Sequence, residues 1–429
     1  MSSRITSQSP ALTTVVTRKP STLTSLHPLT NKTFGVFWTG AFLSSIGFWI
    51  QTEGQGWQVL QLTNSAFLLG LVTFAATLPN IVLSLFGGVI SDRLNRRYLL
   101  IVTQSIYMTT AALLGILTTL HIITVWQIII LALINGTFSS IGFPAWQTFV
   151  GDLVPPEELK QGIALNSMQF NLSRVIGPAI GGLSVGLFGI AGSYYLNALS
   201  YVAVIIPLIF IRAMQKQRIV EQEGIWSGLR VGLDYALQRP TILIMLFLQF
   251  LIAFLVFPYT TLLPIFAGNI FRVGATGLGI LNAAAGIGAL LGSIFIVLLS
   301  QHLEGKRSLR LLLAVGIVGG GASILFSLTP NVPTALPILL LLGTCSVMSM
   351  TVTNTTIQSQ TPIAMRGRVL SLWILVAFGI APFGNLVMGW LAQYLGAPLT
   401  LALGGGLCAI GALVVIVLRS LMRTKTVLS

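Results

Sequence analysis

Long apolar runs separated by short polar gaps constrain the fold of this chain more than any other feature. A membrane-spanning helix needs about 20 consecutive, mostly apolar residues. The sequence contains twelve such runs, at residues 34–60, 66–91, 98–120, 123–146, 162–188, 192–213, 241–264, 275–300, 308–329, 335–357, 368–393 and 397–418. The runs are too long, and their polarity alternates too weakly, for the strands of a membrane barrel. The sequence therefore predicts an all-α membrane protein with twelve transmembrane helices.

The scarcity of charge agrees with lipid as the solvent. Charged residues make up 7% of the 429 residues and apolar residues 54%, whereas about 25% of a typical soluble domain is charged. A net charge of +14 can indicate nucleic-acid binding, but the basic residues here are scattered pairs that flank apolar runs. We therefore expect the lipid bilayer, and no nucleic acid, as a partner. Cys345 and Cys408 lie inside apolar runs without metal-ligand spacing, so we expect packing positions and no metal.

The basic residues fall on one side of the predicted membrane. With the N-terminus inside, 21 of the 23 Lys and Arg residues lie in inner gaps or tails, whereas Arg272 lies outside and Arg174 lies within a span. The positive-inside rule then predicts cytoplasmic termini in a multi-pass protein of the cell inner (plasma) membrane. A miscounted helix would scramble this pattern, so it also supports twelve spans. We expect a monomer, because one chain supplies both halves.

The longest polar gap divides the chain into two halves. Within that gap, the stretch Gly224–Gln238 has apolar residues at helical spacing, which predicts a surface helix ended by Pro240. The Ser/Thr-rich N-terminus indicates a disordered tail, although a targeting peptide shares that composition. The predicted parts are a cytoplasmic N-terminal tail (1–33), an N-terminal six-helix bundle (34–213), a cytoplasmic linker (214–240), a C-terminal six-helix bundle (241–418) and a cytoplasmic C-terminal tail (419–429).

The two halves also resemble each other. The gap before the fifth span reads Val154-Pro-Pro-Glu-Glu-Leu-Lys160, and the gap before the eleventh reads Thr361-Pro-Ile-Ala-Met-Arg366. The fifth span then carries Gly177-Pro-Ala-Ile-Gly181-Gly182, and the eleventh carries Ala381-Pro-Phe-Gly384. A repeat of this kind is typical of transporters.

Glu53 is the acidic residue in the least expected place. Eight of the nine acids lie beside Lys or Arg in polar gaps, whereas Glu53 lies inside the first span. A carboxylate at membrane depth is costly and is a functional candidate by default. Trp49 and Trp57, at i−4 and i+4, share its helix face and can hold a cationic or aromatic ligand. In apolar surroundings the carboxylate can exchange a proton near neutral pH. The alternatives are a solvated residue at the outer mouth and a structural ion-pair partner.

Arg174 is the other charge inside a span, near the middle of the fifth. Three roles are open: it neutralises an anionic substrate, pairs with Glu53 across a cavity, or holds a helix carbonyl. The estimated depths of the two residues differ by about 10 Å, which argues against a direct pair. Polar residues such as Gln51, Asn171 and Asn282 are further candidates for a cavity lining, although each could equally bond another helix.

A charged turn follows the second span, in Gly87-Gly88-Val-Ile-Ser-Asp92-Arg93-Leu-Asn95-Arg96-Arg97. Small residues allow close helix contact, and an acid then flanks a basic cluster. Such a group suits a cytoplasmic latch, in which Asp92 pairs with Arg366 or Arg368 or faces the positive end of the eleventh span. The alternative is a charged turn that merely obeys the positive-inside rule.

These motifs resemble those of the major facilitator superfamily. The turn is similar to its signature Gly-x-x-x-Asp-Arg-x-Gly-Arg-Arg, matched by Gly88, Asp92, Arg93, Arg96 and Arg97, with Asn95 replacing the second Gly. The fifth span resembles its antiporter signature, matched by Gly177, Pro178, Gly181 and Gly182. The stretches Asn166–Arg174 and Arg366–Val369 are similar to the secretion-effector branch, which includes enterobactin and macrolide exporters. The superfamily's fourth-span Arg is absent, since that region reads Asn135-Gly136.

The resemblance implies two six-helix bundles that rock around a central cavity. It also implies a secondary active transporter that exports drug-like or siderophore-like molecules, driven by the proton gradient and without a bound cofactor. A facilitator or importer of the same fold is the alternative. ATP-driven export is disfavoured, because the sequence has no Gly-x-x-x-x-Gly-Lys-Ser/Thr loop. A membrane enzyme or sensor is the alternative of a different class, but the three His residues lie in a tail and two loops and form no catalytic set.

Overall fold

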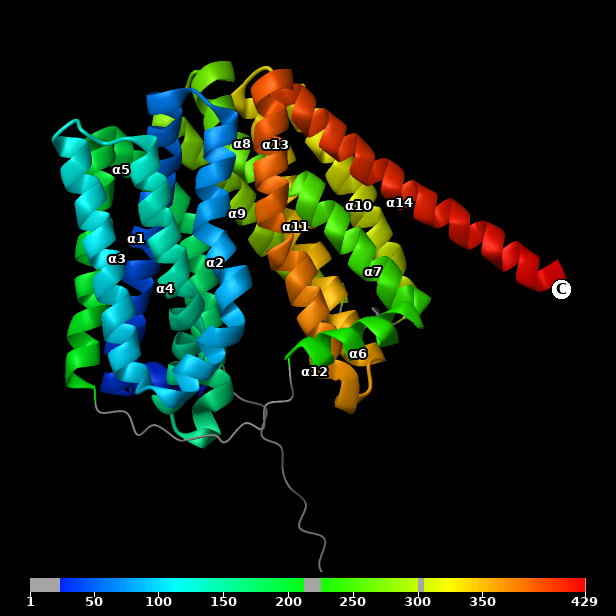
Figure 1. Ribbon diagram of the computed structural model, residues 1–429, viewed down its shortest axis with the longest axis horizontal. Coiled ribbons are helices and arrows are strands. Elements are labelled where there is room, and N and C mark those ends of the chain that lie inside the picture. Colours follow the sequence, from blue (N-terminus) through cyan, green and yellow to red (C-terminus); the bar gives the residue numbers. More distant parts are fainter. Residues whose placement is uncertain (1–23, 212–224, 300–304, 429) are drawn as a thin grey trace, which may run out of the picture.

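The computed structural model describes residues 24–211, 225–299 and 305–428. Within these ranges, the description leaves out the side chains of residues 24–26, 84–93, 225–229, 306, 363–364 and 421–428. The described residues form helices joined by short turns (Figure 1), and none of them forms a strand. The predicted all-α class is therefore confirmed.

The first half of the chain forms five long helices. They are α1 (Lys32–Thr63), α2 (Ala66–Arg93), α3 (Arg96–Thr119), α4 (Val125–Asp152) and α5 (Leu159–Phe210), with short helices η1 (Thr24–Thr30) and η2 (Pro156–Glu158). Polar side chains begin several of them, as expected for N-caps. Asn95, which replaces the signature Gly, accepts hydrogen bonds from the backbone nitrogens of Arg97 and Tyr98 and so starts α3.

The 52-residue α5 contains two membrane crossings rather than one. Its backbone is non-helical at Gly189, where φ is 70° and ψ is 178°, a conformation open almost only to glycine. At one level of the membrane, Trp38 of α1 donates a 2.9 Å hydrogen bond to the Leu165 carbonyl, and Gly40 of α1 abuts Ala203. The two arms of α5 therefore run antiparallel against α1, which confirms the predicted fifth and sixth spans.

The second half contains a surface helix and six further crossings. Its helices are α6 (Ile225–Leu237), α7 (Pro240–Leu251), α8 (Tyr259–Ile265), α9 (Gly274–Leu299), α10 (Lys306–Ser327), α11 (Val332–Gln360), α12 (Ile363–Ile374), α13 (Ala381–Leu395) and α14 (Ala397–Leu428). Wider π-helical turns at Ile252–Val256, Phe266–Ile270 and Leu375–Gly379 join α7 to α8, extend α8, and join α12 to α13. Pro258 and Pro382 follow two of these turns, as expected where proline removes a helix donor.

Eleven helical segments of the described chain are long and apolar enough to cross a membrane. One of them, Pro156–Phe210, has 55 residues, more than twice the length that one crossing requires, and it reverses at Gly189. Counting its two arms gives the twelve predicted crossings. The predicted surface helix is confirmed as α6, in which Gly232 packs against the backbone of Arg368 in α12.

The chain ends differ from the prediction. Residues 24–30 of the expected disordered tail form η1, because Leu29 packs on a hydrophobic cluster around Phe34 and Phe37. The expected C-terminal tail continues α14 to Leu428, since residues 419–428 contain no Pro or Gly to end a helix. Figure 1 shows this end of α14 projecting away from the other helices. Residues 1–23 and 212–224, which include residues 214–224 of the predicted linker, lie outside the described residues.

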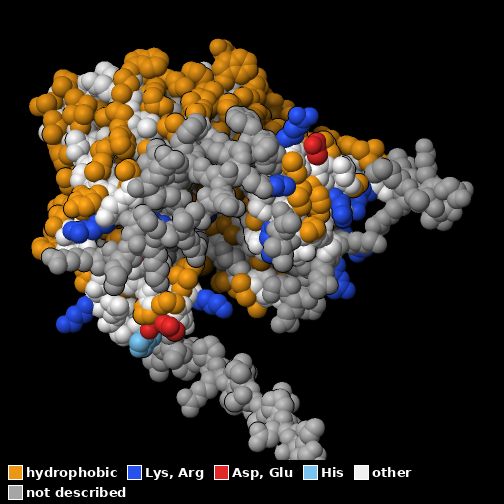
Figure 2. Space-filling view, turned by 60° about the horizontal axis from the view of Figure 1, so that its bottom comes forward, with side chains coloured by type: hydrophobic (Ala, Val, Ile, Leu, Met, Phe, Trp, Pro, Cys, Tyr) orange, Lys and Arg blue, Asp and Glu red, His pale blue; other side chains and the backbone are white. Residues whose placement is uncertain are grey.

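The two ends of the molecule differ in charge. The end that carries the α2–α3 turn and α6 also carries most of the described Lys and Arg residues, and we call it the basic face. It faces the viewer in Figure 2, where Lys and Arg side chains surround its centre. The other end, here the opposite face, carries the α1–α2 turn and Arg272.

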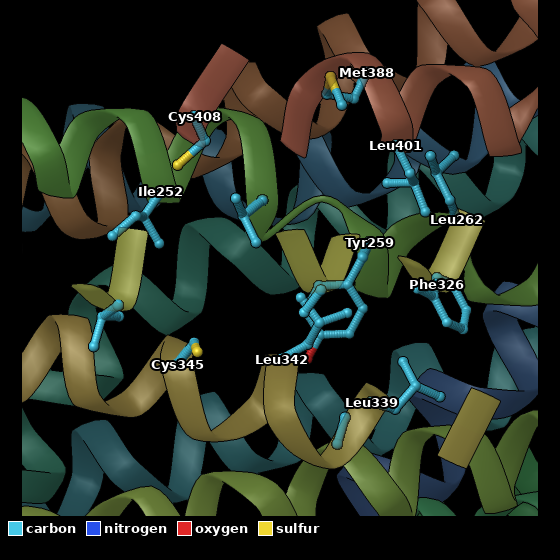
Figure 3. Packing of buried hydrophobic residues seen from close by; sticks show 14 of the residues in the cluster. Ile252, Tyr259, Leu262, Phe326, Leu339, Leu342, Cys345, Met388, Leu401 and Cys408 are labelled. Atoms are coloured by element: carbon cyan, nitrogen blue, oxygen red, sulfur yellow. The ribbon is translucent and has the colours of Figure 1, made fainter. Parts of the chain in front are cut away.

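Each half has its own apolar core. The largest cluster lies in the second half (Figure 3), where Tyr259 lies beside Leu342 of α11 and Phe326 lies near Leu262. Cys345 and Cys408 are buried in that cluster as free thiols, which agrees with the packing positions expected for them.

Candidate functional site: a cavity between the two halves

A cavity of about 640 Å³ lies between the two halves of the chain. This volume is typical of pockets that hold a small organic ligand. Helices α1 to α5 supply most of its lining, and α8 and α9 supply the rest. Its aromatic lining residues are Phe48, Trp49, Tyr107, Tyr201 and Tyr259. Aromatic rings and polar groups together can bind an amphipathic molecule in several orientations.

Glu53 and Arg174 are the charged residues of this lining. The structure therefore brings the two intramembrane charges of the sequence to one cavity. They do not form an ion pair within the described residues, where the ion pairs are His27 with Glu158 and Arg96 with Asp152. This agrees with the difference in depth estimated from the sequence. The cavity holds one acid and one base without direct neutralisation.

Glu53 is buried, with 5% of its surface exposed. Its Oε2 accepts a 3.1 Å hydrogen bond from Nδ2 of Asn282 in α9. Burial excludes the solvated outer-mouth alternative, and no described cation lies at ion-pair distance, which excludes the ion-pair alternative for the described residues. A buried acid held by a neutral amide can exist with or without its proton.

The glycines of the antiporter-like motif let three helices meet at Glu53. A Cβ placed on Gly181 would lie 2.9 Å from Cγ of Glu53, and one placed on Gly182 would lie 2.8 Å from Cα of Gly279 in α9. A Cβ placed on Gly177 would lie 2.5 Å from Cβ of Trp49. These distances are too short for any larger residue without displacement. The close packing predicted for this motif is confirmed, whereas Pro178 lies within continuous helix and lines the cavity.

The remaining cavity candidates divide into two groups. Trp49 and Gln51 line the cavity, and Gln51 accepts a 2.7 Å hydrogen bond from Asn197 on the second arm of α5. Trp57 packs, partly buried, against the apolar clusters of both halves. Asn171 is exposed and donates to the carbonyl of Ser167. The structure does not place Trp57 or Asn171 in the lining.

Asn282, one of the polar candidates, does line the cavity. Sequence reasoning did not single out three further lining residues: Tyr107, Tyr201 and Tyr259. They lie on different helices, and the rings of Tyr107 and Tyr201 are 5.8 Å apart. Tyrosine also occurs at helix contacts outside cavities, so residue type alone carried no signal. Among the described residues, no group of three or more His, Cys, Asp or Glu side chains could hold a metal ion.

The charged turn after α2 is tied to the first half. Arg96 Nη1 forms a 2.9 Å ion pair with Asp152 Oδ2 at the end of α4, and Arg97 Nε donates a 2.6 Å hydrogen bond to the Leu208 carbonyl. A cation at the last carbonyls of a helix is stabilised by the helix dipole. The signature residues Arg96 and Arg97 therefore fasten α3 to α4 and α5.

Part of the predicted cytoplasmic latch lies among residues whose side chains the structure does not describe. The side chains at Gly88, Asp92 and Arg93 belong to the part of α2 for which only the backbone is described. Arg366 and Arg368, expected in the gap before a span, lie instead in the first turns of α12. Arg368 contacts Met365 Sδ at 3.6 Å and is partly buried.

Comparison with known proteins decides the family. The chain matches the transmembrane secretion effector family over residues 23–427. The protein belongs to this family, within the major facilitator superfamily. It is 27% identical over 373 residues to the staphyloferrin A transporter of Staphylococcus aureus, covering 86% of this chain and 92% of that protein. It is 28% identical over 413 residues to the enterobactin exporter of Shigella boydii, covering 95% and 97%.

Solved structures agree with this fold. A bacterial homologue of the human lysosomal transporter Spinster, in an inward-facing and unoccupied conformation, superimposes with a TM-score of 0.70 at 14% identity, covering 90% of this chain and 96% of that one. The nucleoside transporter NupG superimposes with a TM-score of 0.68 at 13% identity, covering 90% and 98%. The family member described here is a membrane transporter of the major facilitator type.

Proposed function

We propose that this transporter exports a small organic molecule, siderophore-like or drug-like, in exchange for protons. The observation that carries the proposal is Glu53, a buried carboxylate in the cavity between the halves, held by a neutral amide rather than by a cation. Such a group can release and rebind a proton during transport. The names of the two relatives, a staphyloferrin A transporter and an enterobactin exporter, support a siderophore-like substrate.

Alternating access accounts for the arrangement of contacts between the halves. Towards the opposite face, Asn269 donates to Asn64 and Ser65 donates to Gln393, each at 2.8 Å. Deeper in the same seam, Thr276 contacts the Gly182 carbonyl. These bonds join the first half to the second beyond the cavity. We assign this arrangement to the state closed at the opposite face, and transport then requires these contacts to open.

The sidedness follows from the basic residues. By the positive-inside rule the basic face lies in the cytoplasm, and both termini lie there too. The relatives are bacterial transporters, one of them named an exporter, which supports the inner membrane as the location. Because one chain supplies both walls of the cavity, a monomer is sufficient for transport.

Arg174 gives the cavity a preference for anionic groups. It is a permanent cation, it lines the cavity, and no described carboxylate neutralises it. Arg174 is half-buried. A charge at membrane depth without a partner is costly, and a carboxylate or similar group of the substrate would reduce that cost. Glu53 would accept a hydrogen bond from a donor elsewhere on the same molecule. The substrate that fits best carries both kinds of group on an aromatic or apolar body.

The test uses purified protein in vesicles with an imposed proton gradient and a pH-sensitive dye inside. Compounds are first chosen by screening for molecules that accumulate in cells lacking the protein. Addition of such a compound should move protons through the wild type, whereas Glu53→Gln should bind the compound but lose the response to the gradient. Glu158→Gln, a change of the same kind on the basic face, should behave as wild type.

Two results would overturn the proposal. If Glu53→Gln transports with unchanged dependence on pH, Glu53 is not the proton carrier. If no imposed gradient affects wild-type transport, the protein is a facilitator rather than an antiporter.

A further inference from the structure

Asn282 lies at the centre of the seam between the two halves. Its neighbours on the same face of α9 are Gly279, three residues before, and Gly286, four residues after. A Cβ on Gly279 would lie 2.7 Å from the Pro178 carbonyl oxygen, and one on Gly286 would lie 2.9 Å from the Arg174 carbonyl oxygen. Helix α9 is therefore pressed against α5 on both sides of Asn282. This packing places the amide where it reaches past α5 to Glu53 on α1.

We infer that Asn282 is the positioning residue that allows the two halves to separate at the opposite face only when Glu53 carries a proton or is bonded by substrate. The inference rests on the proposed proton exchange. It names the residue of the second half that couples opening of the seam to the protonation of Glu53. Glu53 belongs to the first half and Asn282 to the second, so their bond must break when that seam opens.

The strength of this bond depends on the charge of Glu53. A hydrogen bond to an ionised carboxylate is about twice as strong as one between neutral groups. Opening the seam while Glu53 is ionised would also leave a buried charge without a donor, which is strongly unfavourable. With a proton on Glu53, both costs fall. A substrate donor that replaces the Asn282 amide has the same effect.

This rule produces coupled exchange. A transporter without substrate, in which Glu53 is ionised, stays closed at the opposite face. It therefore cannot open there until it binds substrate or a proton. It reorients with substrate in one direction and with a proton in the other. Without the Asn282 bond, the empty ionised form would also reorient, and each such cycle would let one proton leak down its gradient.

The other titratable groups near Glu53 do not supply the same control. Arg174 and Tyr201 on the two arms of α5, Tyr107 on α3 and Tyr259 on α8 line the cavity, and α9 carries no titratable residue. Within the described residues, Asn282 is the hydrogen-bond partner of the Glu53 carboxylate. Arginine stays charged in proteins, so Arg174 does not change its own charge when Glu53 gains or loses a proton.

The test measures proton leak through reconstituted full-length protein, with protons as the probe and no substrate present. Asn282→Ala should raise the leak by about tenfold or more, because a hydrogen bond to a charged group contributes at least a factor of about ten. Asn282→Gln, which keeps the amide donor, should restore much of the tight coupling. The double variant Asn282→Ala with Glu53→Gln should not leak, because the proton carrier is gone.

Asn171→Ala is the matched control. It removes an amide donor that bonds within α5, to the Ser167 carbonyl, outside the cavity lining, and it should not raise the leak. Thermal unfolding and gel filtration confirm that each variant is folded. A folded Asn282→Ala protein that does not leak, or a leak that persists in the double variant, would refute the role of Asn282.

The failure of this inference is distinguishable from the failure of the proposed function. If the wild type exchanges a compound from the accumulation screen for protons while the Asn282→Ala variant shows no increased proton leak, only the role of Asn282 is wrong. If the wild type shows no proton-coupled exchange and Glu53→Gln changes nothing, the proposed function itself is wrong.

Discussion

Two largely buried carboxylates, Glu53 and Asp152, have opposite kinds of partner. Asp152 lies at the basic face, with 9% of its side chain exposed, and forms an ion pair with Arg96 of the same half. Glu53 lies in the cavity, is 5% exposed, and is bonded by the amide of Asn282 from the other half. The first pair holds α3 and α4 together, whereas the second joins the two halves, which separate in the proposed transport cycle.

The partner decides whether the acid can change its charge. Arginine stays protonated in proteins, so loss of charge on Asp152 would break a buried ion pair. An asparagine amide can donate to a carboxylate through Nδ2 or accept from a carboxylic acid through Oδ1. Glu53 therefore has a partner in both protonation states. An acid bonded by an amide is suited to exchange protons, whereas an acid paired with an arginine is suited to stabilise the packing of two helices.

The largest expected difference is in stability. Asp152→Asn should lower the free energy of unfolding by about 3–5 kcal/mol, because it removes the charge of one partner in a buried ion pair. Glu53→Gln should change it by less than about 1 kcal/mol, since the new amide still accepts from Asn282. Thermal and denaturant unfolding of both variants in detergent measures the contrast, and equal losses of stability would remove the distinction.

A smaller effect is expected at the seam that brings Asn282 to Glu53. Gly182→Ala places a Cβ 2.8 Å from the Gly279 backbone, so it should cost about 1–3 kcal/mol by overpacking and slow transport. Gly321→Ala in α10 is the control, because no atom lies within 4 Å of the added carbon and alanine favours a helix. Similar unfolding curves for the two variants would contradict the close contact at Gly182.

Arg174 provides a third test, as a cavity charge without an ionic partner among the described residues. Arg174→Gln should not destabilise the protein, because no described pair is broken, but it should weaken binding of anionic compounds by about tenfold, or ~1.4 kcal/mol. Binding of neutral compounds of similar size, measured by the same titration, serves as the control. A loss of stability as large as that of Asp152→Asn would indicate a structural role for Arg174 instead.

The smallest effect is expected for an acid that is partly exposed. Glu158 contacts His27 at 2.7 Å, with 23% and 66% of their side chains exposed. Solvent weakens such pairs, so Glu158→Gln should change stability by less than about 1 kcal/mol. Unfolding at two salt concentrations measures it. An effect comparable to that of Asp152→Asn would show that burial is not what separates the two acids.

Much of the fold was predictable because lipid imposes simple requirements. Each crossing must be apolar and about 20 residues long, so the twelve crossings and the position of the turn near Gly189 follow from hydropathy. The predictions for the two chain ends were wrong for a local reason. Composition does not reveal that Leu29 packs on the first half or that α14 continues past the membrane.

The cavity was predictable in part. Glu53 and Arg174 were found because a charge inside a span is rare, and Trp49 because it shares a helix face with Glu53. The same periodicity argument placed Trp57 beside them, but that face of α1 turns from the cavity into the apolar packing of both halves. Asn171 was chosen for its polarity alone, and it lies on an exposed face of α5.

The sequence by itself determined that this protein crosses a membrane twelve times and carries one acid and one base at membrane depth, because hydropathy and charge are properties of single residues and their immediate neighbours. Only the tertiary structure decided which partner each buried acid has. Asn282 lies 229 residues from Glu53 in the chain, and Arg96 lies 56 residues from Asp152. Glycine contacts between α1, α5 and α9 bring the first pair together, and such contacts depend on how helices pack rather than on any local pattern.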